Sequence, residues 1–516
     1  MSNPFEARPP YHFVLIAVAA IWPYANFYAV NIYAGIPFVD LALYAGASVV
    51  VLVCLYLFLV TVLPRWLHGP ACLALACGYV VFFFYGFIGD AFRYFQIFSI
   101  KGQFSVWILA TLIVCGAALG LGRYRSVLIS ATVGISAMLV ISVMQAASGF
   151  ADVRMSRGDG IEEHLDNTFN PSGNVRRSNV YSLVLDTYSR ADYFLKIFNI
   201  NNNPFLDALR ARQFQVGAQS MSNYPWTSLS MSSSLSMDYT TVGGPSQPHD
   251  ALKMAEVING LNPVVRQFSR DGYDYVLFSS GRYETTISCS GLENVCLQCD
   301  GTLTESDILL LEKTPIAHLV RKFAAPLYMD FAGKCRISDL QKKLSVLKGK
   351  RFFLLSHHMA LHDPQNVNSN CEKLDTPIPQ KWLHEDHADL VRMQLECLNK
   401  EVLALVDHIV RVDPQAFILL TGDHGFWPQT DSEITESAKR EMRHAVFTAM
   451  RLPAACRDSF KDDITPINHY RVIFGCLNNQ TPVMLPDKYF SVEAIEPGNP
   501  RTTLRVTEWS PKNSSK

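Results

Sequence analysis

The first 150 residues constrain the fold most, because charged side chains are rare in them. The charged residues there are Glu6, Arg8, Asp40, Arg65, Asp90, Arg93, Lys101, Arg123 and Arg125. They leave five uncharged windows, near residues 11–33, 41–63, 67–89, 103–121 and 127–148. A helix that crosses a bilayer needs about 20 apolar residues at a rise of about 1.5 Å each. The sequence therefore predicts a transmembrane domain of five helices over residues 1–150.

The basic residues beside these windows predict the orientation of the chain. With the N-terminus in the cytoplasm, the inner segments carry Arg8, Arg65, Arg123 and Arg125, and the outer segments carry Arg93 and Lys101. Basic residues are enriched in cytoplasmic loops, so this bias favours a cytoplasmic N-terminus. After five spans, everything beyond about residue 150 is on the other side. We therefore expect a multi-pass protein of the inner (cytoplasmic) membrane with an extracytoplasmic, periplasmic domain.

The rest of the chain alternates strand-like and helix-like runs. Strands are predicted at residues 179–185, 275–279, 352–357, 416–421 and 445–450, and helices at 251–260, 304–323 and 387–412. Short apolar strands separated by amphipathic helices predict an α/β domain with a mostly parallel central sheet. We expect a linker at residues 151–178, this α/β domain at 179–490, and a frayed C-terminal tail at 491–516.

Charge and cysteine content narrow the partners and the compartment. The formal net charge of the 516 residues is −1, and no long cluster of Lys and Arg occurs, so a nucleic-acid partner is not expected. Eight cysteines lie beyond the predicted spans, an even number that is compatible with disulfides in an oxidising compartment. Three of them, Cys289, Cys296 and Cys299, also allow a zinc knuckle. Because a fourth local ligand is missing, a loop closed by disulfides is preferred.

Ligand-type side chains follow two of the predicted strands. Asp186 comes directly after Tyr-Ser-Leu-Val-Leu, and Asp423 with His424 follows Phe-Ile-Leu-Leu-Thr-Gly. Sites in parallel sheets gather where strands end. Taken alone, Asp186 is also typical of a helix N-cap. Asp423 and His424, set between two glycines that permit close approach, form the more specific signal.

Hydroxyl groups and further histidines occur between these two points. Thr227 and the competing Ser228 begin a Ser-rich stretch whose interleaved Met and Leu residues predict the start of a helix. A nucleophile there would gain from backbone N–H groups and the helix dipole. Another candidate pair, His357 and His362, lies in Ser-His-His-Met-Ala-Leu-His-Asp-Pro, where we expect metal ligands or donors to phosphate oxygens, and His358 can point the other way.

Together these motifs resemble the sulfatase-like branch of the alkaline phosphatase superfamily. The resemblance spans roughly residues 179–485, and the five predicted spans narrow it to membrane-anchored members such as lipoteichoic acid synthases and phosphoethanolamine transferases. It implies one divalent metal ion, zinc or manganese, held by Asp186, Thr227, Asp423 and His424. It also implies that Thr227 is the catalytic nucleophile and that His357 and His362 bind substrate.

The same resemblance implies a phospho-group transferase of phosphoglycerol or phosphoethanolamine type, or a hydrolase. The donor would be a phospholipid head group and the acceptor an envelope glycan or lipid. Two alternatives stay open: a sulfatase, and a non-catalytic relative that serves in assembly of surface polymers. Sulfatases use a Cys or Ser that is oxidised to formylglycine and followed by Pro and Arg, whereas here Pro225 precedes Thr227 and no such Arg follows. Phosphoethanolamine transferases carry a Glu where this chain has Phe426.

Overall fold

The computed structural model of the chain divides into two compact units. It describes residues 10–32, 36, 38–94, 100–157, 178–240, 244–245, 248–279, 289, 291–299, 305–324, 335–359, 361, 365–378, 388–426, 435–494 and 504–511. The helical unit comprises residues 1–158 and 306–324, and the α/β unit comprises residues 159–305 and 325–516. The chain therefore passes between the two units three times.

Five helices of the helical unit are long and apolar enough to cross a membrane, as the uncharged windows predict. These helices are α1 (Pro10–Val30), α2 (Phe38–Val62), α3 (His68–Tyr94), α4 (Ile100–Leu121) and α5 (Arg125–Arg157), and a short 3-10 turn, η2 (Arg65–Leu67), precedes α3. The last helix continues past residue 150, so the first residues of the predicted linker are helical. Residues 158–177 of the predicted linker lie outside the described residues.

Helix α1 packs against α2, α3 and α5 and supplies much of the apolar core of this unit. Polar groups within that core are paired, as a lipid environment requires. The Nδ1 atom of His12 lies 2.6 Å from the Tyr56 hydroxyl. By contrast, α4 and α5 expose large apolar side chains such as Leu112 and Met144, each 66% exposed. Such surfaces suit contact with lipid.

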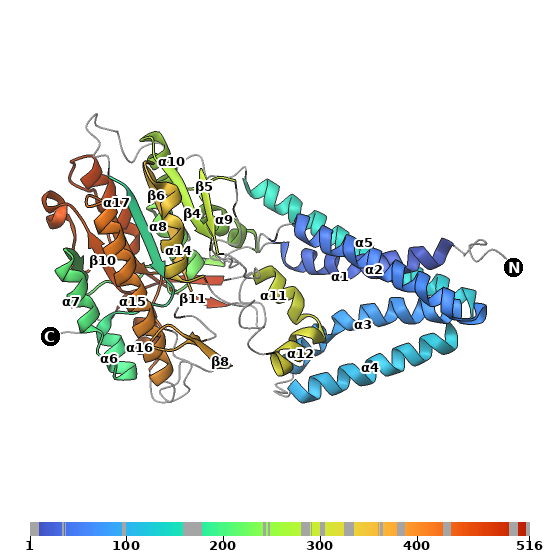
Figure 1. Ribbon diagram of the computed structural model, residues 1–516. Coiled ribbons are helices and arrows are strands. Elements are labelled where there is room, and N and C mark those ends of the chain that lie inside the picture. The colour runs from blue at the N-terminus through green and yellow to red at the C-terminus, as the bar shows by residue number, and fades with distance from the viewer. Residues whose placement is uncertain are drawn as a thin grey trace. The chain divides into compact units, whose positions relative to one another are not determined.

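Two further helices of the helical unit come from the middle of the sequence. They are α11 (Glu305–Glu312) and α12 (Pro315–Phe323), drawn in yellow beside the ends of α3 and α4 in Figure 1. The sequence predicts one helix at 304–323 within the α/β domain, and this is corrected on two counts. Pro315 starts a new helix because it has no N–H to continue the earlier one. The segment also groups with the spans instead of with the sheet.

The α/β unit is built on a seven-stranded sheet with the strand order β2-β10-β9-β1-β6-β4-β5. The strands from β9 to β5 are parallel, and only β10 runs in the opposite direction, with antiparallel pairing to β9 on one side and to β2 on the other. The predicted mostly parallel sheet is therefore confirmed. The strands are β1 (Val180–Leu185), β2 (Phe214–Val216), β4 (Asp274–Ser279), β5 (Val295–Gln298), β6 (Phe352–His358), β9 (Phe417–Gly422) and β10 (Thr448–Arg451).

Helices cover both faces of this sheet, as Figure 1 shows. The core on one face is shared with α6 (Ala191–Phe198), α7 (Asn203–Ala211), α14 (Ile337–Lys343), η3 (Leu344–Leu347) and α15 (Ala388–Val412). The core on the other face is shared with α8 (Thr227–Ser236), α9 (Pro248–Ile258), α10 (Pro263–Arg270), η5 (Ala454–Ser459) and α17 (Pro466–Leu477). We call this second face the α8 face.

The C-terminal residues form a structure that the sequence does not predict. Strands β11 (Tyr489–Ala494) and β12 (Leu504–Trp509) pair antiparallel, and β3 (Gly244–Pro245) joins β12. Phe490 and Leu504 of this sheet pack against Tyr224 and Leu229 in a small apolar core. The predicted frayed tail is therefore wrong for residues 504–509, because alternate apolar residues of β12 are buried by pairing with a distant segment.

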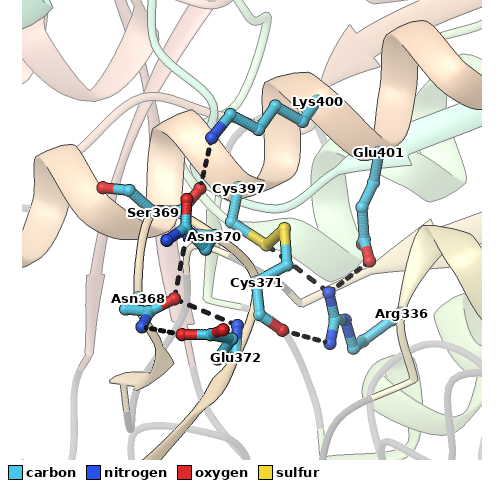
Figure 2. Close-up of a disulfide and its surroundings, with 9 residues drawn as sticks. All are labelled: Arg336, Asn368, Ser369, Asn370, Cys371, Glu372, Cys397, Lys400 and Glu401. Carbon is cyan, nitrogen blue, oxygen red and sulfur yellow. Dashed lines mark hydrogen bonds and ion pairs between the residues drawn. A yellow bond between two sulfur atoms is a disulfide. The ribbon is translucent and has the colours of Figure 1, made fainter.

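Four disulfides join the eight cysteines beyond the spans: Cys289–Cys296, Cys299–Cys335, Cys371–Cys397 and Cys456–Cys476. The preference for disulfides over a zinc knuckle is thus confirmed. Figure 2 shows how Cys371–Cys397 ties the antiparallel hairpin of β7 (Gln365–Val367) and β8 (Lys373–Ile378) to α15. Arg336 supports this junction, because it pairs with Glu401 and donates to the Cys371 carbonyl at 2.9 Å. One further helix, α16 (Glu436–His444), leads into β10.

Candidate metal centre

Parallel register aligns the ends of three central strands. Leu185 of β1 is level with His358 of β6 and Gly422 of β9. Asp186 and Asp423 therefore emerge at equivalent positions of two hydrogen-bonded strands, which are about 4.8 Å apart in a sheet. His357 lies next to Val184 of the neighbouring strand. Residues far apart in the sequence thus reach one edge of the sheet.

The two-residue period of a strand decides which side chains share a face. Val184, Leu355 and Leu419 lie in the core of the α8 face. Two residues further along these strands, Asp186, His357 and Thr421 continue on that face. Asp423 lies two residues after Thr421 and follows on the same face. His358 has the opposite parity, and its ring stacks on Phe278 in the core of the other face. The expected opposite direction of His358 is therefore observed.

Helix α8 brings the candidate nucleophile to the same face. Its residues Met231 and Leu235 pack in the core of the α8 face, and Thr227 is its first residue. The Thr227 hydroxyl lies 3.2 Å from Nε2 of His424. This places the alcohol at the amino end of a ten-residue helix, where backbone N–H groups and the dipole favour a bound anion.

Asp423 is held firmly, and one of its oxygens is left for a ligand. The backbone N–H groups of Thr187 and His424 donate to Oδ1 at 3.0 and 2.8 Å. The other oxygen, Oδ2, lies 3.4 Å from Nε2 of His424. Thr187 adopts a left-handed φ of 59° to present its N–H, a conformation that is costly for a β-branched residue. Strain of this kind is typical of functional sites.

The two glycines that flank Asp423 and His424 permit this tight turn. A Cβ on Gly422 would lie 2.5 Å from the Tyr188 carbonyl oxygen, and one on Gly425 would collide with the Met442 and Ala445 carbonyl oxygens. Ser230 also fixes the turn, because its hydroxyl donates to the Asp423 carbonyl at 2.6 Å.

The hydrogen bond of His424 to the backbone defines its tautomer. Nδ1 lies 2.8 Å from the Gly425 carbonyl oxygen, which can only accept, so Nδ1 carries the proton. In the neutral ring, Nε2 then offers a lone pair toward Thr227 and Asp423. Burial lowers the pKa of His424 despite the attraction of Asp423, so the neutral form predominates near pH 7. This is the form that binds a metal ion.

His357 belongs to the same group of donors, which is one of the two roles, metal ligand or donor to phosphate, that the sequence leaves open for it. One ligand atom each from Asp186, His357 and Asp423 lies within 4.8 Å of the others, and all three residues are buried. Nε2 of His357 is 3.6 Å from Oδ2 of Asp186. Burial lowers the pKa of His357 to about 4, although Asp423 opposes the shift. The family resemblance assigns His357 to the substrate, whereas the structure places it beside both carboxylates.

Arg443 adds a positive charge that sequence patterns do not reveal. Burial lowers its pKa to about 9, and the carboxylates of Asp423 and Asp186 oppose that shift by attraction. Its guanidinium lies 5.8 Å from the ring centroid of Trp226, the residue before the candidate nucleophile. No short motif surrounds Arg443, so only the tertiary structure connects it with this site.

The chemistry of these donors fits a divalent cation. Burial opposes the ionisation of Asp423, but the imidazoles of His424 and His357 and the hydrogen bonds to its carboxylate outweigh burial and lower its pKa. Two buried carboxylates that face each other repel unless a cation lies between them. Carboxylate oxygen and neutral imidazole nitrogen are ligands that zinc accepts, and manganese also accepts oxygen ligands.

The predicted site residues are therefore largely assembled at one place. Asp186, Thr227, Asp423 and His424 come together, with His357 added to them. Ser228 is buried within α8, but the Thr227 hydroxyl is the one within hydrogen-bond distance of His424. His362 lies outside the described residues. Phe426, which follows the Asp-His-Gly motif, packs edge-on against Phe194 and Phe198 in the core of the other face.

No protein-family model and no curated protein sequence matches the chain. Solved structures similar to it include integral membrane lipooligosaccharide phosphoethanolamine transferase A from Neisseria meningitidis, with 14% identity over 90% of this chain and 95% of that chain and a TM-score of 0.40. The C-terminal periplasmic domain of EptC from Escherichia coli in complex with Zn is 12% identical over 61% of this chain and 85% of that chain, with a TM-score of 0.40. The lipoteichoic acid synthase LtaP from Listeria monocytogenes is 12% identical over 66% of this chain and 83% of that chain, with a TM-score of 0.38.

Proposed function

We propose that the chain is a membrane-bound, metal-dependent phospho-group transferase or related hydrolase that acts through Thr227. The observation that carries this proposal is the position of the Thr227 hydroxyl, 3.2 Å from the lone pair of His424 and at the amino end of α8. Asp186 and Asp423 lie at the ends of the two strands beside it. An alcohol, two carboxylates and neutral imidazoles at one sheet edge are the groups that nucleophilic phosphoryl transfer needs.

Asp186, Asp423 and His424 would hold a zinc or manganese ion together with the Thr227 oxygen, and His357 is a further candidate ligand because it lies within 4.8 Å of both carboxylates. Such an ion lowers the pKa of a coordinated alcohol and offsets charge on phosphoryl oxygens. The residues of the chain supply the rest. The N–H groups at the start of α8 face the transferred group, and the guanidinium of Arg443 stabilises its negative oxygens.

The proposed reaction has two steps. Thr227 Oγ1 first forms a bond to phosphorus and gives up its proton, while the bond from phosphorus to the alcohol of a phospholipid donor breaks and diacylglycerol leaves with one proton. In the second step, an acceptor hydroxyl of an envelope glycan or lipid loses its proton and attacks the same phosphorus, and Thr227 leaves and regains a proton. Water in place of that hydroxyl would give a hydrolase. The five apolar helices support this substrate class, because they place the protein where phospholipid donors reside.

The proposal is tested by replacing Thr227 in the full-length protein, reconstituted in nanodiscs that contain phospholipids with labelled head groups. We expect Thr227→Ala to abolish release of diacylglycerol, whereas Thr227→Ser keeps an alcohol and retains part of the activity. Mass spectrometry of the quenched reaction should find the transferred group on Thr227. Ser228→Ala is the matched control, because it removes the neighbouring hydroxyl.

Two results would contradict the proposal. Unchanged turnover in Thr227→Ala would reject the nucleophile, and loss of turnover in Ser228→Ala alone would assign the role to the neighbour. Activity toward a nitrophenyl sulfate but toward no phosphodiester would instead support the sulfatase alternative.

A further inference from the structure

Helices α11 and α12 are attached to the spans by specific polar contacts. The Tyr44 hydroxyl of α2 donates to Oδ1 of Asp307 at 2.8 Å. The backbone N–H of Gly86 in α3 donates to the Lys313 carbonyl at 3.1 Å, and Nζ of Lys313 pairs with Asp90 at 3.1 Å. Gly86 allows this approach, since a Cβ there would lie 2.5 Å from the Lys313 side chain. The segment is therefore a fixed part of the helical unit.

These contacts lie at one end of the membrane spans. Tyr44 is near the start of the second span, Gly86 and Asp90 are near the end of the third, and Phe104 is near the start of the fourth. The ring of Phe104 is 4.9 Å from that of His318 in α12. Successive spans run in opposite directions, so the start of an even span and the end of an odd span are on the same side. The fifth span also ends on that side, which the sequence predicts to be extracytoplasmic.

One face of α12 is apolar and exposed. Ile316, Leu319 and Phe323 are 42%, 39% and 74% exposed, and their i, i+3, i+7 spacing places them on one stripe of the helix. Ala317, on another side, is buried. Nζ of the exposed Lys322 lies 5.1 Å from the centroid of the Phe323 ring. An apolar stripe with a basic residue at its border is the pattern of a helix that lies in a lipid interface.

We propose that α12 is an interfacial helix that inserts Ile316, Leu319 and Phe323 into the extracytoplasmic leaflet of the membrane. The lipid surface is the occupant that fits, because α12 is attached where the spans leave the bilayer. The neighbouring α4 continues the apolar surface, with Val106 and Leu109 exposed. The charge of Lys322 suits the phosphates of lipid head groups. This inference concerns membrane contact and does not depend on the proposed chemistry.

The depth of Phe323 in the bilayer tests the inference. In the full-length protein, the unpaired Cys54, Cys72, Cys77 and Cys115 are replaced by Ala, and Phe323→Cys then carries an environment-sensitive nitrobenzoxadiazole label. The protein is placed in nanodiscs of phosphatidylethanolamine and phosphatidylglycerol, with and without doxyl-labelled lipid. We expect blue-shifted emission and a loss of emission with the doxyl lipid. The control is Val483→Cys, a 72% exposed apolar residue of the α/β unit, which shows whether an exposed apolar position alone produces either effect.

Label emission at 323 that the doxyl lipid does not quench would overturn the inference. If the label is blue-shifted but not quenched, and the unlabelled Phe323→Cys protein forms a disulfide-linked dimer when an oxidant is added, the apolar stripe is a protein interface and not a membrane contact. A second measurement avoids the label. Phe323→Asp should reduce the protection of α12 from hydrogen exchange in nanodiscs but not in detergent. Equal protection of α12 in nanodiscs and in detergent would also refute the inference. Catalytic activity is not a readout here, so failure of this inference and failure of the proposed function are distinguished.

Discussion

His357 lies beside both carboxylates, and its replacement gives a quantitative test of whether it is a metal ligand or a substrate contact. The change is His357→Asn, because the Asn amide cannot reach the position of Nε2, 3.6 Å from Oδ2 of Asp186. Zinc bound by four protein ligands contributes about 10–16 kcal/mol in small domains, or about 3 kcal/mol per ligand. Since about 1.4 kcal/mol is a factor of ten, we expect the loss of His357 to weaken metal binding roughly 100-fold.

The matched control is His358→Asn. This neighbour is also buried, but its ring stacks on Phe278 on the opposite face of the sheet. Both variants lose a buried imidazole, so a difference between them isolates the contribution of His357 to the metal site. Competition with a chromophoric chelator in the purified full-length protein measures the affinity, and elemental analysis gives the metal content. Equal affinity in the two variants would refute His357 as a ligand, and a raised KM with unchanged metal affinity would return it to the substrate.

Two further predictions concern stability. Removing the Cys371–Cys397 bridge, which spans 26 residues, should lower the free energy of unfolding by about 3.5 kcal/mol through loop entropy. Hydrogen exchange in β7 and β8 should then accelerate by up to roughly 300-fold. Unchanged exchange would show that the bridge does not restrain the hairpin. Burial lowers the pKa of His469 to about 3 from its ordinary 6.5. As the pH drops below 6.5, the unfolded state therefore takes up a proton before the folded state does. The free energy of unfolding falls as a result, by about 2 kcal/mol at pH 5. His469→Phe should remove this share and raise resistance to proteolysis at pH 5 relative to pH 7, whereas an identical pH dependence in both proteins would contradict the argument.

Local patterns in the sequence were sufficient for the spans, the central strands and most donors of the candidate site. Absence of charge over about 20 residues is a demand of the bilayer and can be read without tertiary information. Apolar runs that end in Asp186 and in Asp423 with His424 likewise indicate strand ends in a parallel sheet. These signals depend only on neighbours in the sequence.

The remaining features depend on which segments meet in space. His357 belongs to the donor group because β6 pairs with β1 in a register that places it next to Val184, and no local pattern specifies that register. The apolar stripe of α12 has the same spacing as a stripe that faces a core, so the sequence placed it in the α/β domain. Residues 504–509 form a strand because a partner segment more than ten residues away is available to them.

The balance of charge at the centre bears on which substrate it favours. When Asp186 and Asp423 are both ionised they contribute two negative charges, Arg443 contributes one positive charge, and the buried imidazoles of His357 and His424 are neutral near pH 7. A bound divalent cation changes this sum from −1 to +1. Uncompensated charge is costly in a buried site, so a substrate with a single negative charge completes the balance. A phosphodiester carries one such charge, whereas a phosphate monoester carries close to two near pH 7. Of these two phosphate classes, this charge balance supports the diester in the reaction that we propose.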